Sequence, residues 1–421
     1  MAAALVGRHL GTKPLWLDEA VSVSVARRSF WGVLSVLPHH DANAGVYYVI
    51  LHWVLLLGHT AAWARSLSAV CFALTAGLAS WVGTRWRGAW FGLACGLLVA
   101  TNPFLLFYGQ EARPYALAVL LAVASTAALF SPSRRWYVAA TIALLYVDLF
   151  ALLFVVAVGW RRGRDLWSRI GLAVAPLAVL VVSQRGQISW LPRPSLAVLF
   201  GTFRGMAGSG PALVVVVVLV VLAGRESPPL VAAFVGPPVA LWIVGQFVPA
   251  YTARYVICST IAMIGLVALR ARWPVLVLLG ALGLSSVVRL EARPLKYENT
   301  PALVAFVASR TQSGDAVGYS GGGLRTLIDT YRGTVFPVDV ALAGSQHDIY
   351  ARQVAPPVLA SRLAAVSRIW LITDPTDHGY PTYGPFQPLH ASFLQAFRAS
   401  ASSSFPGIDV TLYVRVRSPT P

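Results

Sequence analysis

Apolar runs of about twenty residues recur between residues 67 and 289, and they constrain the fold more than any other feature of the sequence. An α-helix that crosses a bilayer needs about 20 apolar residues. Over the whole chain, 57% of the residues are hydrophobic and 12% are charged, whereas a soluble domain carries about 25% charged residues. The sequence therefore predicts a polytopic α-helical membrane protein with about ten membrane helices. The clearest runs cover residues 67–84, 89–107, 112–130, 170–183, 211–223, 230–248, 256–269 and 274–289.

Segment 136–160 is too long for one comfortable span, and Asp148 interrupts it. We expect two short helices that meet near Asp148, with one tilted helix as the alternative. The net charge of +17 comes almost entirely from arginines, and many of these lie in short loops between apolar runs, so the charge does not indicate nucleic acid as a partner. If segment 136–160 is a hairpin, these loops all fall on one side, which the positive-inside rule identifies as the cytoplasm. The loops contain Arg85, Arg87, Arg134, Arg135, Arg161, Arg162, Arg164, Arg169, Arg225, Arg270 and Arg272.

The same topology places several loops on the extracytoplasmic side of a plasma membrane: residues 11–66, 108–111, 184–210 and 249–255, together with the turn at Asp148. Within the first loop, residues 46–57 form a short apolar run, which we expect to lie along the membrane surface as a helix. An ordinary spanning helix is the alternative. Residues 1–10 are too few to span, so we expect the first membrane helix to be truncated or missing.

The chain becomes more polar from about residue 290, which predicts a membrane domain at 1–289, with its first outer loop at 11–66, and an extracytoplasmic α/β domain at 290–421. Strands are predicted over 315–319, 368–373 and 409–416, and helices over 300–310, 324–331 and 390–400. The glycine-rich segment 320–324 follows a strand without a complete phosphate-binding fingerprint, so we expect a plain turn. The three cysteines lie in apolar segments and show no metal or disulfide spacing.

Carboxylates are rare in the first 289 residues. Of the seven acidic residues there, Asp165 and Glu226 fall in predicted cytoplasmic loops, and the other five fall at the predicted outer face. Ionisable groups at membrane depth are costly and tend to line sites. Five acids from four separate segments therefore predict a common pocket; they are Asp18, Glu19, Asp41, Glu111 and Asp148.

Basic residues accompany these acids at the same predicted face. Arginine suits a phosphate, because its planar guanidinium group makes paired, charge-assisted hydrogen bonds. This face thus combines carboxylates that can abstract a proton with cations that can hold a phosphate leaving group, as a transferase with a lipid-phosphate donor requires. The cations are Lys13, Arg65, Arg113 and Arg254.

Each of these residues also has a structural interpretation. Glu111 and Arg113 can form a local ion pair, and Asp148 can simply end a helix. Arg65 and Arg254 can extend toward lipid headgroups.

Five motifs resemble those of the GT-C membrane glycosyltransferases. The closest resemblance is to the branch that contains the protein O-mannosyltransferases and the lipid A aminoarabinose transferases (glycosyltransferase family 39-like), and within it to the actinobacterial members. The resemblance covers roughly residues 11–289. The motifs are WLDEA (16–20), HDANAGVYYVILHW (40–53), RSLSA (65–69), YGQEARPY (108–115) and YTARY (251–255).

This resemblance implies an inverting transfer of a sugar from a polyprenyl-phosphate donor to an acceptor hydroxyl. Asp18, with Glu19 beside it, maps onto the acidic residue of the first outer loop that is the candidate base. The implied donor and phosphate site comprises Arg65, Glu111, Arg113, Arg254 and Tyr255. The implied sugar or acceptor pocket comprises His40, Asp41, Tyr47, Tyr48, Gln110, Tyr115 and Asp148.

The sequence departs from the family pattern at three places. The first membrane helix is truncated or absent, Asn43-Ala44-Gly45 stands where relatives often have a proline pair, and Asp148 stands where relatives often have a histidine. Donor and acceptor identity therefore stay open. Mannose is the first expectation for the sugar, arabinose is the second, and the acceptor is a glycan, a glycolipid or a protein of the cell envelope.

No cofactor is indicated with certainty. A divalent metal held by His40, Asp41 or Glu111 is one alternative, although the spacing of His39, His40 and Asp41 is equally that of an exposed loop. Two other functions compete with the transferase: a transporter or flippase for lipid-linked sugars, and a membrane anchor for the C-terminal domain. The clustered polar groups at one face favour the enzyme, because transporters usually place their sites near the bilayer midplane.

Overall fold

The computed structural model describes residues 1–130, 133–159, 164–189, 191–343 and 352–416. The chain divides into two compact units, which are described separately below. The membrane unit contains residues 1–11 and 37–293, and the C-terminal unit contains residues 12–36 and 294–421. Residues 12–36, which belong to the first outer loop 11–66 in the sequence interpretation, therefore fold with the C-terminal residues.

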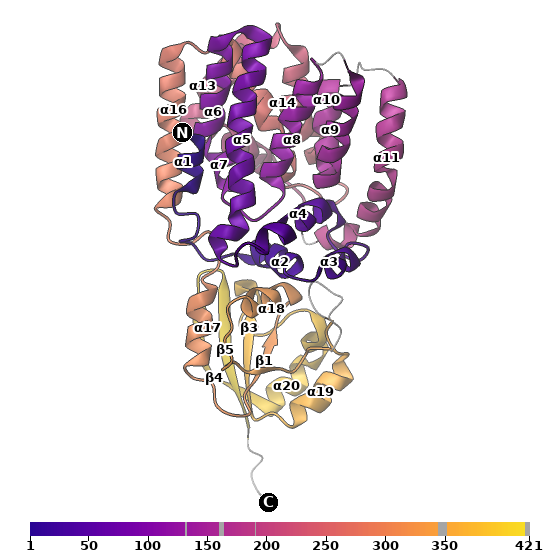
Figure 1. The fold of residues 1–421 in the computed structure, drawn as a ribbon. Coiled ribbons are helices and arrows are strands. Elements are labelled where there is room, and N and C mark those ends of the chain that lie inside the picture. The colour runs from indigo at the N-terminus through magenta and orange to yellow at the C-terminus, as the bar shows by residue number, and fades with distance from the viewer. Residues whose placement is uncertain (131–132, 160–163, 190, 344–351, 417–421) are drawn as a thin grey trace, which may run out of the picture. The chain divides into compact units, whose positions relative to one another are not determined.

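The membrane unit is helical (Figure 1). Among the described residues, four helices are long and apolar enough to cross a membrane, or up to six if each of two bent helix pairs counts as one span. The bends are 61° between α6 and α7 and 86° between α12 and α13. The predicted helical membrane protein is confirmed. The helices are α1 (Ala2–Gly7), α4 (Gly45–Leu55), α5 (Ala61–Arg87), α6 (Ala89–Thr101), α7 (Pro103–Gly109), α8 (Tyr115–Ala128), α9 (Arg134–Val147), α10 (Leu152–Gly159), α11 (Arg164–Ser183), α12 (Leu196–Ala207), α13 (Gly210–Gly224), α14 (Pro228–Gly245), α15 (Ser259–Arg270) and α16 (Trp273–Glu291), with the 3-10 turns η1 (Ala42–Ala44), η2 (Leu149–Ala151), η3 (Arg185–Ile188) and η4 (Ala253–Val256).

Two short helices meet at Asp148, as the sequence predicts. The backbone of Asp148 is extended, and its side chain accepts a hydrogen bond from the Phe150 N–H at 3.0 Å. One prediction for this unit is wrong: residues 184–210 are not only loop, because they contain α12. Ser195 caps this helix by accepting the Val198 N–H, which starts it after Pro194.

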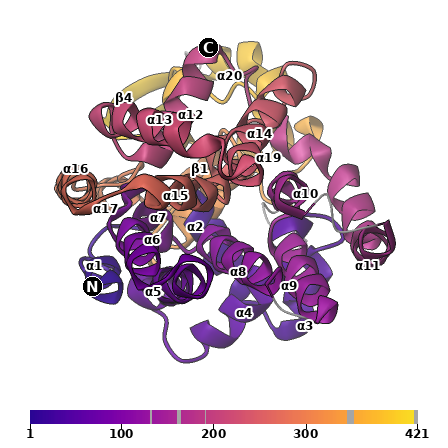
Figure 2. The ribbon, with the colours of Figure 1, turned by 90° about the horizontal axis from the view of Figure 1, so that it is seen from above.

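Helix α4 lies across one end of the helix bundle instead of running parallel to its long members. In Figure 2 the long helices α5, α9 and α11 are seen end-on, whereas α4 is seen from its side. Its 11 residues extend over only about 16 Å, about half of a 30 Å hydrocarbon core. The geometry agrees with the predicted surface helix and disagrees with the spanning alternative.

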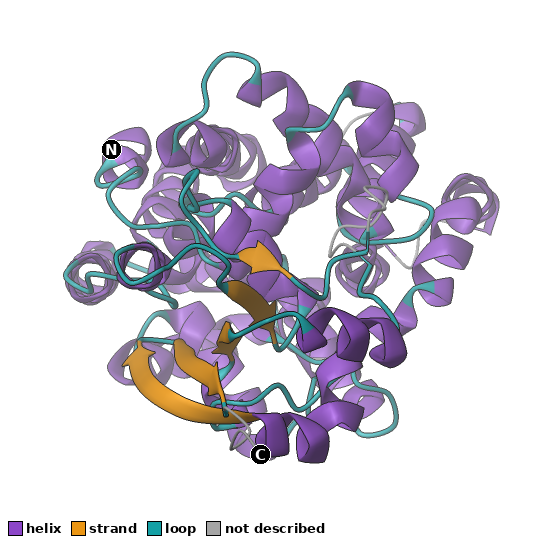
Figure 3. Ribbon diagram, turned by 90° about the horizontal axis from the view of Figure 1, so that it is seen from below, coloured by secondary structure: helices purple, strands orange, loops and turns teal. Residues whose placement is uncertain are grey.

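The C-terminal unit is built on one five-stranded sheet with the order β2-β1-β3-β5-β4 (Figure 3). Strand β1 pairs in parallel with β2 and β3, while β5 is antiparallel to β3 and β4. The predicted α/β domain is confirmed. Its elements are α2 (Leu17–Ala26), α3 (Phe30–Val36), α17 (Thr300–Ala308), β1 (Ala316–Tyr319), α18 (Gly322–Asp329), β2 (Val338–Asp339), α19 (Pro356–Ala364), β3 (Arg368–Thr373), η5 (Pro375–Asp377), η6 (Gly384–Leu389), α20 (His390–Ala396), β4 (Phe397–Phe405) and β5 (Ile408–Arg415).

The central strand β3 explains the two cores of this unit. Successive side chains of a strand point to opposite faces, so Ile369 and Leu371 enter one apolar cluster while Trp370 and Ile372 enter the other. The predicted helix 390–400 is too long, because α20 ends at Ala396 and the following nine residues form β4. Pairing of β4 with β5 along its length outweighs the helical propensity of its alanines.

A close approach of α5 and α6 provides a test of the helical packing. A Cβ atom on Gly92 would lie 2.4 Å from the Ser80 carbonyl oxygen and 2.6 Å from the Thr84 nitrogen. We therefore expect Gly92→Val to force the two helices apart at a cost of about 1–3 kcal/mol, which a lower melting temperature in detergent would register. Gly77→Val is the matched control, because nothing lies within 4 Å of a Cβ atom at Gly77. Equal melting temperatures for the two variants would contradict this packing.

Candidate functional site

Asp41, Tyr48 and Arg113 form the polar centre of the membrane unit. The Tyr48 hydroxyl donates a hydrogen bond to the Asp41 carboxylate, Arg113 donates to that hydroxyl at 3.3 Å, and the Arg113 Nη1 atom lies 3.6 Å from the Asp41 Oδ2 atom. Tyr48 is fully buried, whereas the Asp41 side chain is 29% exposed. A carboxylate and a guanidinium group are thus held together at an accessible position.

Asp41 takes a left-handed backbone conformation, with φ of 51°, and two glutamines hold the chain around it. Gln187 accepts the Asp41 N–H at 3.0 Å and lies 3.2 Å from the His40 Nδ1 atom. Gln184 accepts the Ala42 N–H at 3.0 Å and donates to the Leu37 carbonyl at 2.8 Å. A left-handed non-glycine residue needs such support, and the turn η3 that follows α11, with its N-cap Gln184, provides it.

Asn43 connects the same segment to the break at Asp148. Its Oδ1 atom accepts the Leu149 N–H at 2.7 Å, and its Nδ2 atom donates to Asp148 at 3.5 Å. Asp148 is 1% exposed. This carboxylate therefore has a helix-ending contact with Phe150 and a bridging contact with Asn43.

Two arginines contact the ring of Tyr115. The guanidinium carbons of Arg113 and Arg254 are each 5.9 Å from the centroid of its ring. Arg254 also lies 5.8 Å from the ring of Tyr255, and Tyr255 stacks on Phe150 with a centroid separation of 4.1 Å. Both guanidinium groups thus approach the same aromatic ring through cation–π contacts.

A pocket opens between these elements. It brings together several residues that the sequence predicts, and adds others that sequence reasoning missed. The predicted lining residues are Asp41, Arg113, Tyr115 and Tyr255; the added ones include Asn43, Phe150, Gln184, Arg185 and Gln187. Uncharged glutamines gave no signal in the count of acids and cations, although loop 184–210 does lie on the predicted outer face.

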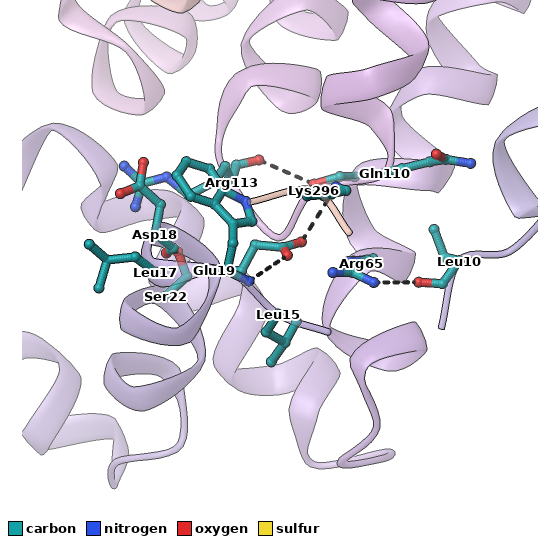
Figure 4. Close-up of polar contacts among 12 residues, drawn as sticks. Leu10, Leu15, Leu17, Asp18, Glu19, Ser22, Arg65, Gln110, Arg113 and Lys296 are labelled. Carbon is teal, nitrogen blue, oxygen red and sulfur yellow. Dashed lines mark hydrogen bonds and ion pairs between the residues drawn. The ribbon is translucent and has the colours of Figure 1, made fainter. Parts of the chain in front are cut away.

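Other predicted residues have structural contacts outside this lining. Arg65 is 1% exposed and donates to the Leu10 carbonyl at 2.9 Å (Figure 4). Gln110 donates to the carbonyls of Val6 and Arg8 at 3.1 and 3.0 Å. Tyr47 bonds to Ser68 at 3.1 Å, and Glu111 is fully buried. These residues hold the start of the chain and the loop before α8.

The two adjacent acids of the first loop, Asp18 and Glu19, lie in the C-terminal unit, in the first turn of α2. Glu19 is fully buried. Its Oε2 atom accepts the Trp16 N–H at 3.4 Å, and its Oε1 atom lies 3.9 Å from the Lys296 Nζ atom (Figure 4). Asp18 is only half-buried. The neighbouring carboxylates therefore have different environments.

Glu298 is a further acid beside α2 that sequence reasoning missed. Its carboxylate accepts the Leu17 N–H at 3.4 Å. Burial raises the pKa of Glu298 above its ordinary value, and the charges of Asp18 and Asp374 raise this pKa further. Asp18 and Glu298 are thus near enough to interact electrostatically.

No group of three or more histidine, cysteine, aspartate or glutamate side chains in the described ranges is arranged to hold a metal ion. The residues named for a metal, His40, Asp41 and Glu111, do not form such a group.

Neither a protein-family model nor a curated protein matches the sequence. Solved structures do match. ArnT from Cupriavidus metallidurans in the apo state has a TM-score of 0.64 at 12% identity, over 97% of this chain and 96% of that chain. The same protein bound to undecaprenyl phosphate has a TM-score of 0.58 at 13% identity, over 98% and 96%. ArnT is a lipid A aminoarabinose transferase with a GT-C fold. The chain therefore has the GT-C fold that its motifs predict.

The Asn43 bridge is testable by substitution. Asn43→Leu keeps a similar volume but removes the acceptor of the Leu149 N–H and the donor to Asp148. We expect the variant to lose about 1–3 kcal/mol of stability, because buried polar groups are left without partners. Thermal unfolding in detergent measures the loss. Asn299→Leu serves as the control, since the Asn299 side chain does not cap α17; equal losses would contradict the bridge.

Proposed function

We propose that the protein is an inverting glycosyltransferase that moves a sugar from a polyprenyl-phosphate donor to an acceptor hydroxyl on the extracytoplasmic side of the plasma membrane. The observation that carries the proposal is that Arg113 and Arg254 both contact the ring of Tyr115, and that Arg113 and Tyr115 line a pocket. The GT-C fold supports it, because one solved neighbour of this fold is ArnT bound to undecaprenyl phosphate.

The proposed reaction is a direct displacement at the anomeric carbon. The acceptor oxygen forms the new bond to this carbon while the bond to the donor phosphate oxygen breaks, and attack from the opposite face inverts the configuration. A general base takes the acceptor proton. The polyprenyl phosphate leaves with the bonding electrons, so its negative charge increases during the step.

Asp18 is the proposed base. The resemblance maps Asp18 onto the base of the first outer loop. Its neighbour Glu19 is fully buried and contacts the Trp16 N–H and Lys296, whereas Asp18 is half-buried. Arg113 and Arg254 are the proposed phosphate ligands. Guanidinium groups that meet charge where it develops lower the barrier, and removal of one such group typically costs about 100-fold or more in rate.

Mannose is the first candidate for the transferred sugar, with arabinose or aminoarabinose as the second, and cell-wall biogenesis is the proposed context. The acceptor is a glycan, a glycolipid or a protein hydroxyl. A flippase for the lipid-linked sugar is the alternative, since it would also need a phosphate-binding pocket. The two functions differ in whether a glycosidic bond is broken.

Replacement of the proposed base gives the first test. In membranes supplied with a panel of polyprenyl-phosphate sugars, we expect Asp18→Asn to reduce transfer by about 1000-fold or more while donor binding persists. Asp165→Asn is the control, because Asp165 is an exposed acid at the start of α11. Wild-type turnover in Asp18→Asn would refute the base assignment. Sugar movement without glycosidic cleavage would favour the flippase.

Replacement of a proposed phosphate ligand gives the second test. We expect Arg254→Ala to lower kcat/KM for the donor by roughly 100-fold. Arg254→Lys should recover only part of the lost kcat/KM, because lysine lacks the planar guanidinium group that makes paired hydrogen bonds to a phosphate. Arg272→Ala, at an exposed loop arginine, should leave kcat/KM unchanged. Equal donor kinetics in Arg254→Ala and wild type would exclude Arg254 from the phosphate site.

A further inference from the structure

Three consecutive residues of the C-terminal unit contact the start of helix α2. The Lys296 Nζ atom lies 3.9 Å from Glu19, the Tyr297 ring lies 4.3 Å from the ring of Trp16, and the Glu298 carboxylate accepts the Leu17 N–H at 3.4 Å. These contacts lie directly before and after Asp18 in the sequence. Residues 296–298 are called the clamp below.

The clamp is largely removed from water at its charged contact. The side chain of Lys296 is 6% exposed, and that of Glu19 is fully buried. An ion pair in such an environment keeps its partners strictly placed, because loss of one partner leaves a buried charge that costs about 3–5 kcal/mol. Loss of Lys296 would therefore leave Glu19 as an uncompensated buried charge in the first turn of α2.

Helix α18 and the residues that follow it add a second anchor. The Tyr331 hydroxyl bonds to both the N–H and the carbonyl of Leu15. The Leu17 side chain lies against Gly323 in the first turn of α18, where a Cβ atom would come within 3.1 Å of it. Leu17 therefore has its partner in α18, and Leu15 has its partner just after α18.

The position of Leu17 is informative in view of the strand order. The chain passes from β1 to β2 on one side and then crosses to β3 on the other. Sheets of this topology bind ligands outside the carboxyl ends of the strands where the order reverses. Here Leu17 of α2 packs against the first turn of α18, directly after β1. A segment of the chain's own first loop therefore lies where other sheets of this topology bind a ligand.

We propose that the clamp, Lys296-Tyr297-Glu298, positions Asp18 for proton abstraction, which makes the C-terminal unit a scaffold for the catalytic base. This inference rests on the proposed function. The clamp residues are positioning residues: they act through α2 and do not contact the reacting atoms. A misplacement of about 1 Å in a catalytic group costs roughly 100-fold in rate, so small changes in the clamp should appear in turnover.

The experiment measures kcat and donor KM separately in the full-length protein. Lys296→Met should lower kcat by roughly 10- to 100-fold and leave donor KM within about two-fold, because the proposed phosphate ligands are Arg113 and Arg254. Lys296→Arg should restore most of the turnover, since it retains the charge facing Glu19. Arg332→Met is the matched control, because it removes an exposed ion pair with Asp329 in the same unit.

A second pair of variants covers the case in which Lys296→Met fails to fold. Glu298→Gln keeps an oxygen that can accept the Leu17 N–H, whereas Glu298→Ala removes it. We expect kcat to fall in Glu298→Ala and to stay close to wild type in Glu298→Gln, with both proteins melting at similar temperatures.

Asp18→Asn in the same assay distinguishes failure of the positioning role from failure of the proposed function. If Asp18→Asn is inactive while Lys296→Met and Glu298→Ala turn over like wild type, the positioning role is refuted and the base assignment stands. A loss confined to donor KM would also refute the positioning role. If Asp18→Asn is active, the proposed function itself fails.

Discussion

A backbone amide inside a bilayer has no water to bond, and this constraint governs where a helix of the membrane unit can break. At the bend between α6 and α7, Asn102 accepts the Leu105 N–H at 3.0 Å and donates to the Met206 carbonyl at 2.8 Å. At the bend between α12 and α13, Ser209 accepts the Ala212 N–H at 3.2 Å. At the break after α9, Asp148 accepts the Phe150 N–H at 3.0 Å. At each of these breaks a side chain replaces a lost backbone hydrogen bond.

Several polar residues of the candidate pocket lie at the ends of helices. Asn43 and Asp148 bond across two of them, and Gln184 and Gln187 follow the end of α11 and hold the left-handed Asp41. Groups that satisfy the backbone thereby also hold the pocket wall in place. A substitution there changes the local fold and the pocket together, which is why stability and kinetics must be measured side by side.

Hydropathy alone predicted most of the membrane helices and, with Asp148 as an interruption, the break between α9 and α10. The sequence patterns did not predict elements that are short or that depend on pairing with another segment. Helix α12 was hidden in a predicted loop. Strand β4 was assigned partly to a helix, because no local pattern shows that this segment pairs with the predicted strand β5. The pocket residues Asp41, Arg113, Tyr115 and Tyr255 were predicted by charge and motif. The glutamines of η3 and its flank were missed because an amide carries no charge. The attachment of residues 12–36 to the C-terminal unit was missed because it depends on contacts between residues nearly 300 positions apart in the sequence, which no local pattern encodes.

The adjacent acids of the first loop show how helix geometry separates two side chains of similar chemistry. Neighbouring residues on an α-helix, with 3.6 residues per turn, point about 100° apart. Glu19 therefore enters the interior, where the Trp16 N–H and Lys296 compensate its charge, while Asp18 stays partly accessible. A buried and fully engaged carboxylate is a poor base, because protonation would disrupt the contacts that hold its own helix. The geometry of α2 thus gives two neighbouring acids different environments, a difference that neither residue type nor spacing could have assigned.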